Sequence, residues 1–140
     1  MAIGLEPDDT DLLAQAYVNR SYGYGNLGRT DDGIVDATAA IELEPDDTNI
    51  LAMAYINRST ANMNLGRLDD AISDTTAVIE LAPDNTVLLG NAYLFRGALR
   101  FDRGQVVGAE TDARRAIELL PADHELARTA HEFLDGIGAG

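Results

Sequence analysis

The chain has no cysteine, few basic residues and no long apolar run. Without cysteine, disulfide and thiol chemistry are excluded. Ten Lys and Arg residues against 24 Asp and Glu residues give a net charge of −14, which argues against a nucleic-acid partner, because clustered cations bind a phosphate backbone. No segment reaches the roughly 20 apolar residues that span a bilayer, and the first residues lack the basic and apolar regions of a signal peptide. We therefore expect a soluble cytoplasmic protein without membrane contact.

Proline is also scarce, and its spacing is regular. The four prolines lie 38 residues apart, at Pro7, Pro45, Pro83 and Pro121. Residues 7–44 and 45–82 are identical at 24 of 38 positions, and residues 83–120 form a more divergent third copy. A fixed period of this size indicates one supersecondary unit repeated in tandem. Function is therefore expected on surfaces that the repeats build together.

Each repeat predicts two helices and no strand. Apolar residues recur at helical spacing over residues 10–27, and Gly28 interrupts them with the residue that best adopts the left-handed conformation past a helix end. Thr30 or Asp31 is then predicted to cap a second helix that stops before Pro45. The same pair is predicted over residues 48–81 and 86–119. The expected fold class is all-α.

The repeats predict one continuous solenoid domain over residues 1–140. Its expected parts are a remnant of a preceding helix (1–6), repeat 1 (7–44), repeat 2 (45–82), repeat 3 (83–120) and a terminal helix (121–137). The remnant is inferred because residues 2–7 match the phrase that ends the first repeat. We interpret the chain as a piece of a longer array.

A recurring Pro-Asp-Asp-Thr phrase supplies many of the acidic residues. Beside a helix start, Asp and Thr accept hydrogen bonds from free backbone N–H groups, and Asp complements the positive end of the helix dipole. We interpret the phrase as a capping and solubility feature. Attraction for a basic partner is the alternative.

Each repeat also has an arginine in its first helix and an aspartate sixteen residues later, with the turn glycine midway between them. In an antiparallel hairpin the two side chains lie at the same height, about 12 Å from the turn. A planar guanidinium can donate two hydrogen bonds to one carboxylate. Because every copy has the pair, whereas a catalytic pair is needed only once, we interpret these as structural pairs. They are Arg20 and Asp36, Arg58 and Asp74, and Arg96 and Asp112.

The second repeat shows a family pattern most completely. Its first helix has Tyr55 and then Ser59, its turn has Gly66, its second helix has Ala71 near the start, and Pro83 closes the unit. In this register the chain resembles tetratricopeptide repeat (TPR) proteins. The resemblance implies a right-handed α-solenoid of antiparallel helix hairpins, here three full repeats and a C-terminal capping helix, and a role in protein recognition.

The chain departs from the family pattern in three ways. Its period is four residues longer than the family's usual period of about 34 residues. The four added residues, which are 48–51 in the second repeat, lengthen each first helix by about one turn, or 6 Å. This extra turn is apolar, so we expect it to pack, through Leu12, Leu13, Ile50, Leu51, Leu88 and Leu89. Gly33 replaces the alanine of the second helix in repeat 1. Small residues replace the family's bulky aromatic, which suggests closer helix packing: Ala37, Thr75 and Ala113.

In the family, the first helix of each repeat lines the concave face, and side chains that point away from the second helix hold the ligand. The resemblance maps this face onto an apolar groove with interspersed amides. The residues are Gln15, Val18, Asn19, Tyr22, Asn26, Met53, Ile56, Asn57, Thr60, Met63, Asn64, Asn91, Leu94, Phe95, Ala98 and Phe101, with Asp102 at the end. Exposed methionine and aromatic residues suit an apolar or amphipathic peptide. The alternative is that some of these side chains pack under the next repeat.

One subclass of the family clamps the terminal carboxylate of chaperone peptides with Lys, Arg and Asn. At those positions this chain has Val18, Tyr22, Asn57, Asn91 and Phe95, of which only Asn57 fits. Because the cationic part is missing, we predict no binding to chaperone C-termini.

No group of residues supplies a nucleophile, a base and an oxyanion donor together, so no enzymatic activity is expected. His124 and His131 are seven residues apart, a poor spacing for one metal ion, and each is interpreted as a surface or seam residue. Residues 8–11 lack the spaced oxygens and glycine of a calcium loop. We expect no metal and no cofactor.

The leading hypothesis is a non-enzymatic module that binds a peptide segment of a partner protein in the concave groove. Asn19, Asn57 and Asn64 are expected to fix the ligand backbone. The apolar contacts are expected from Tyr22, Met53, Ile56, Met63, Leu94 and Phe101. Two alternatives remain at this point: a scaffold that stacks end to end through its open N-terminal end, and a regulatory arm of a larger multidomain protein.

Overall fold

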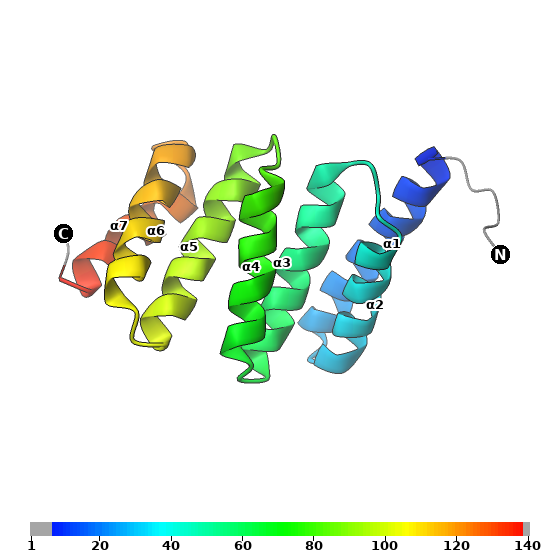
Figure 1. Ribbon diagram of the computed structural model, residues 1–140, viewed down its shortest axis with the longest axis horizontal. Coiled ribbons are helices and arrows are strands. Elements are labelled where there is room, and N and C mark those ends of the chain that lie inside the picture. The colour runs from blue at the N-terminus through cyan, green and yellow to red at the C-terminus, as the bar shows by residue number, and fades with distance from the viewer. Residues whose placement is uncertain (1–6, 139–140) are drawn as a thin grey trace.

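The computed structural model describes residues 7–138, which form seven α-helices and no strand. The helices are α1 (Pro7–Asn26), α2 (Thr30–Glu42), α3 (Thr48–Asn64), α4 (Leu68–Leu81), α5 (Thr86–Asp102), α6 (Val106–Leu119) and α7 (Glu125–Gly136). Three hairpins lie side by side in chain order, so that α1 and α7 are at opposite ends of the molecule (Figure 1). The predicted all-α fold is confirmed. The predicted helix remnant at residues 1–6 lies outside the described residues.

A glycine closes the turn of every hairpin, as the sequence predicts. At the first turn, Gly28 has a φ of +74°, a left-handed value that favours glycine. The N–H of Arg29 donates to the carbonyl of Tyr24 at 2.9 Å, and the N–H of Gly28 donates to that of Gly25 at 3.1 Å. These two bonds define a Schellman motif. The same pair of bonds recurs at the other two turns, which fixes all three hairpins in one geometry.

The second helix of the first hairpin begins without a side-chain cap, so the predicted cap was wrong. The residue that precedes α2 is Arg29, and no side chain caps the helix there. Thr30 and Asp31 lie inside the first turn instead. The reason is that the turn is only three residues long, so Arg29, which completes the Schellman motif, also occupies the cap position directly before α2. Asp31 and Asp32 still complement the helix dipole from the first turn.

The first helices of the second and third hairpins have the predicted caps. Asp47 accepts a hydrogen bond from the N–H of Asn49 at 2.8 Å. Asn85 accepts from the N–H groups of Val87 and Leu88 at 3.0 and 3.1 Å. The capping interpretation of the acidic phrase is confirmed for these two copies. In the first copy the phrase is helical from Pro7 onward.

The core is a seam that runs between successive helices. Fully buried small residues line it, among them Ala37, Thr75 and Ala113. At the C-terminal end, α7 covers Leu94 and Leu120 with Ala127 and Ala130.

The extra helical turn packs in two repeats and is exposed in the first. Ile50 is buried against the first hairpin, and Leu88 packs against the cluster around Val78. Leu12 and Leu13, which occupy the equivalent places in α1, are 68% and 40% exposed. The prediction that these two leucines pack was wrong, because no described element covers that side of α1.

Candidate functional site

The first helices of the hairpins form the inner layer of the solenoid. α1 contacts α3, α3 contacts α5, and α5 contacts α7, whereas α2, α4 and α6 make no contact with one another. Helices that touch along one layer and separate along the other give a curved stack whose inner side is the touching layer. The predicted groove residues all belong to α1, α3 and α5, and so to this inner layer.

The predicted groove residues differ in exposure. Seven are exposed: Asn19, Tyr22, Asn26, Thr60, Met63, Asn64 and Phe101. Seven are half-buried: Gln15, Met53, Ile56, Asn57, Asn91, Phe95 and Ala98. The remaining two, Val18 and Leu94, are only 4% and 8% exposed. The inner layer therefore presents a mixed apolar and amide surface.

Val18 and Leu94 serve mainly as core residues. Val18 packs with Ala14 and Ile50 in the seam between the first two hairpins. Leu94 is buried under α7, next to Ala127. Helical spacing places both residues on the predicted face, but it does not show what covers them. The expectation that Leu94 is a contact residue for a ligand is wrong for this reason, whereas Val18 still lines the floor of a cleft.

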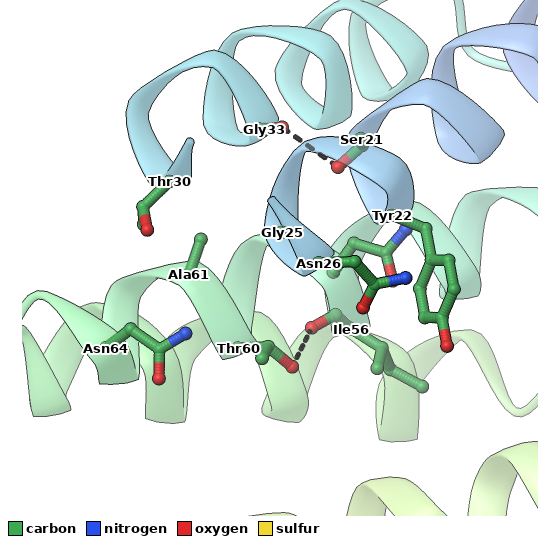
Figure 2. A pocket seen from close by; sticks show the side chains of 11 residues that line it. Ser21, Tyr22, Gly25, Asn26, Thr30, Gly33, Ile56, Thr60, Ala61 and Asn64 are labelled. Carbon is green, nitrogen blue, oxygen red and sulfur yellow. Dashed lines mark hydrogen bonds between the residues drawn. The ribbon is translucent and has the colours of Figure 1, made fainter. Parts of the chain in front are cut away.

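The structure brings the predicted residues of α1 and α3 together around two adjoining clefts that share Tyr22, Ile56 and Asn57. The outer cleft has a volume of about 450 Å³ and is lined by Val18, Asn19, Tyr22, Met53, Ile56, Asn57 and Leu88. The inner cleft has a volume of about 240 Å³ and is lined by Ser21, Tyr22, Gly25, Asn26, Thr30, Gly33, Ile56, Asn57, Thr60, Ala61 and Asn64. In Figure 2, Tyr22 lies at one end of the inner cleft, and Thr30 and Asn64 lie at the other. The third repeat contributes less, because Phe101 packs edge-on against Phe133 of α7, with ring centroids 5.9 Å apart.

Sequence reasoning missed five residues of the inner cleft. They are Ser21, Gly25, Thr30, Gly33 and Ala61. Their small size is what leaves the space open. A comparison of the repeats offers the signal that could have found them, because larger residues occupy several of the equivalent places in the later copies.

The amides along the clefts are only partly engaged. Asn57 donates to the carbonyl of Val18 at 3.2 Å, which links α3 to α1. Gln15 donates to Asn19 at 2.9 Å. Within residues 7–138, the side chains of Asn26 and Asn64 have no hydrogen-bond partner. An amide offers two donors and an acceptor, so these two side chains can each bind a peptide group.

The predicted arginine–aspartate pairs all meet across their hairpins. Arg20 binds Asp36 through two hydrogen bonds of 2.6 and 2.8 Å. Arg96 binds Asp112 through two bonds of 2.9 and 2.8 Å. The shortest of the three bonds from Arg58 to Asp74 is 2.8 Å, and these bonds raise the pKa of Arg58 above its ordinary value. All three carboxylates are nearly fully buried.

A tyrosine lies beside each of the three arginines, and a threonine joins two of the three sites; the sequence analysis identified neither role. The guanidinium of Arg58 lies 5.4 Å from the ring centroid of Tyr55, a cation–π distance. Arg58 also donates to Thr38 of the preceding hairpin at 3.3 Å. Arg96 makes the same bond to Thr76. These arginines therefore hold their own hairpin and join it to the previous one.

The histidines and acidic residues offer no metal site within residues 7–138, where no group of three potential ligands comes together. His124 instead caps α7, since its Nδ1 accepts a hydrogen bond from the N–H of Leu126 at 3.0 Å. His131 is exposed. No helix of the described residues has both the length and the apolar character that crossing a bilayer requires.

The repeats match a known family model. The model described as tetratricopeptide repeat matches residues 14–47 and 52–85, so that the two matches begin 38 residues apart and leave out residues 48–51. These four are the residues that the sequence analysis identified as the extension of the first helix. The chain is a tetratricopeptide repeat protein. TPR domains form a protein-interaction fold, and this TPR chain is a helical solenoid of helix hairpins.

Solved TPR domains have the same architecture. The first TPR of Spaghetti (RPAP3), bound to the HSP90 peptide SRMEEVD, is 25% identical, with a TM-score of 0.76 over 98% of this TPR chain and 96% of that domain. The Arabidopsis OM64 TPR domain is 24% identical, with a TM-score of 0.72 over 91% of this chain and 98% of that one. The first TPR domain of human RPAP3 is also 24% identical, with a TM-score of 0.71 over 91% and 97% of the two chains. A comparison with curated proteins finds no significant match.

Proposed function

We propose that this TPR chain is a non-enzymatic module that binds a peptide segment of a partner protein on the inner layer, between α1 and α3. The observation that carries the proposal is the pair of adjoining clefts that share Tyr22, Ile56 and Asn57. Their walls are apolar at the base, and amides with free hydrogen-bonding capacity stand at the rim. This combination suits a peptide, which presents side chains and backbone amides together.

The occupant differs in charge from the peptide in the similar solved complex. The peptide SRMEEVD in that complex ends in acidic residues. In this chain no arginine lines either cleft, and the net charge is −14. At the positions of the family's carboxylate clamp the chain has no cation, but Val18, Tyr22, Asn57, Asn91 and Phe95. We infer a neutral or basic segment as the ligand, because an acidic terminus would meet repulsion without a compensating cation.

A selection from random peptides tests the proposal. Peptides displayed on phage are selected on the intact protein, and the affinities of synthetic copies are measured by fluorescence anisotropy. Because Tyr22 and Ile56 form the shared wall of the clefts, we expect Tyr22→Ala and Ile56→Ala each to weaken binding about tenfold or more. Val35→Ala is the matched control, since Val35 is 66% exposed on α2, outside both clefts. Unchanged affinity in both groove variants, or a loss in the Val35 variant alone, would refute this placement.

End-to-end assembly is a second candidate, favoured by the apolar surface of the first hairpin. Leu12 is 68% exposed, whereas its equivalent Ile50 is buried by the preceding hairpin. Leu27 and Val35 are 73% and 66% exposed on the same hairpin. A second copy of the chain would cover these side chains. Light scattering after size exclusion, over a hundredfold concentration range, decides: a mass that climbs supports assembly, and a constant mass of the 15.0 kDa chain rejects it.

A further inference from the structure

The inner cleft exists because the first two repeats carry small residues at places that later repeats fill. Gly25 in α1 is equivalent to Met63 in α3 and Phe101 in α5. Ala61, on the opposite wall, is equivalent to Leu99 of α5, which is 1% exposed. The chain therefore contains both an open and a filled version of the same seam.

Two glycines shape the cleft in different ways: Gly25 leaves space open, and Gly33 lets α2 pack closely against the backbone of α1. A Cβ built on Gly25 would meet no heavy atom within 4 Å, so Gly25 leaves the mouth of the cleft empty. Gly33 is buried at the back, and a Cβ there would lie 3.3 Å from the carbonyl oxygen of Ser21. That carbonyl belongs to the backbone of α1, next to the hydrogen bond from the Ser21 hydroxyl to the carbonyl of Gly33 (Figure 2). The depth is thus built into the first hairpin.

The cleft has the size of a side-chain subsite. Its volume of about 240 Å³ is below the roughly 300–1,000 Å³ of pockets that enclose a whole small molecule. The side chain of Ile56 and the methyl group of Ala61 form an apolar wall, and no charged side chain lines it. An aliphatic side chain gains most from such a site, whereas a carboxylate would lose its hydration without gaining a cationic partner.

We propose that this cleft is the anchor subsite for one aliphatic side chain, of the Leu, Ile or Met type, within a neutral or basic internal segment of a partner protein. The inference rests on the proposed function of the inner layer, and it adds the type of ligand residue that the cleft selects. Asn26 and Asn64 stand at the rim with free amides and can bind the peptide groups on either side of the anchor. The acidic chain, with its net charge of −14, favours basic flanking residues.

The substitution Gly25→Met tests the cleft without harming the fold. Methionine already occupies the equivalent position in α3, and the space at Gly25 is open. The new side chain should fill the cleft and also favour the helix, because glycine is a poor helix former. Gly23→Ala is the matched control. It also replaces a glycine of α1 with a better helix former, two residues earlier, at a position outside the lining of the cleft.

The probe is a capped amino acid, N-acetyl-leucine-N′-methylamide, titrated into the full chain while backbone amide shifts are recorded by NMR. We expect saturable shifts at Gly25, Gly33 and Ala61, at least tenfold weaker binding of the capped glutamate, and loss of these shifts in Gly25→Met but not in Gly23→Ala. Equal binding of the glutamate compound, or an unchanged response in Gly25→Met, overturns the subsite. The absence of any saturable shift in the wild-type chain overturns it as well.

The peptide selection separates this proposal from the proposed function. If the selected peptides share an aliphatic residue and lose at least tenfold in affinity for Gly25→Met, the anchor subsite is supported. If Ile56→Ala weakens them while Gly25→Met binds them as well as the wild type does, the groove stands and the anchor assignment fails. If the wild type selects no peptide, the proposed function fails. The assignment of a partner protein to the cleft then fails too, even if the capped leucine binds.

Discussion

At the scale of single residues, one buried aspartate recurs in three different settings. Among the side chains of residues 7–138, Arg20 alone holds Asp36, Arg58 and Asn62 hold Asp74, and Arg96 and Arg100 hold Asp112. The arginine that closes the pair is exposed to a different degree in each repeat: 59% for the side chain of Arg20, 25% for Arg58 and 12% for Arg96. The loss of stability on removal of the carboxylate should therefore increase from the first repeat to the third.

Asp112→Ala is expected to destabilise the protein by about 3–5 kcal/mol, because it leaves two arginines without their acceptor in a poorly solvated place. Asp36→Ala should cost clearly less, since water can solvate the exposed guanidinium of Arg20. Urea unfolding followed by circular dichroism measures both. Equal losses for the two variants would contradict the graded burial.

His124 has an uncommon role for its residue type, because its imidazole caps α7 where Asp47 and Asn85 cap α3 and α5. We expect His124→Ala to cost about 1 kcal/mol in unfolding free energy, and His124→Asn to restore the stability. His131→Ala, at an exposed site, should change it by less than about 0.5 kcal/mol. If the alanine variant at His124 is as stable as the wild type, the cap contributes nothing.

At the scale of helices, glycine and two residues with a Cβ, Glu44 and Ala82, adopt the same left-handed conformation at helix ends. Gly66 closes α3 with a φ of +75°, and Ala82 closes α4 with a φ of +47°. A Cβ is unfavourable in this region, so glycine suits the position and alanine strains it.

Ala82→Gly should therefore raise the free energy of unfolding by about 0.5–1 kcal/mol, whereas Gly66→Ala should lower it by about 1 kcal/mol. Chemical denaturation of the two variants beside the wild type tests this. A shift in the same direction for both would show that the left-handed backbone is not the cause.

Most helix boundaries could be predicted because proline and glycine mark them in every copy. The predicted helix ranges of the second and third repeats, 48–81 and 86–119, coincide with the outer limits of the hairpins. The starts of the second helices were harder. Thr30 and Asp31 have side chains that can cap a helix, but the three-residue turn places them inside α2. The length of the turn depends on backbone geometry, which the residue types alone do not reveal.

The site could be predicted only in part. Tyr22, Ile56 and Asn57 are at the clefts because helical periodicity assigns residues to faces. The depth of a residue depends on its neighbours in space, and so the burial of Leu94 under α7 was missed. The inner cleft was missed for a related reason: it depends on side-chain atoms that Gly25 lacks, and only a comparison with the larger residues at the equivalent places of later repeats points to it.

At the scale of the whole molecule, the two ends of the solenoid differ. α7 covers Leu94 and Leu120 and leaves polar residues outside, whereas the first hairpin leaves Leu12 and Val35 exposed. A terminal cover of this kind keeps the last seam out of water.

Removal of residues 121–140 should uncover that seam. Leu94 and Leu120 would lose most of their burial, and we expect a loss of about 3 kcal/mol or more in stability together with self-association at high concentration. Thermal unfolding and light scattering of the truncated and intact chains measure the two effects. A truncated chain that is monomeric and equally stable would show that α7 is dispensable as a cover.

The two layers of the solenoid also differ in whether their helices touch one another. The inner helices α1, α3, α5 and α7 touch in succession, while α2, α4 and α6 do not touch one another. Bending the stack about its inner layer changes the distances between the outer helices without breaking any contact among them. A change of curvature would therefore be taken up where each outer helix packs on the next inner one, α2 on α3 and α4 on α5.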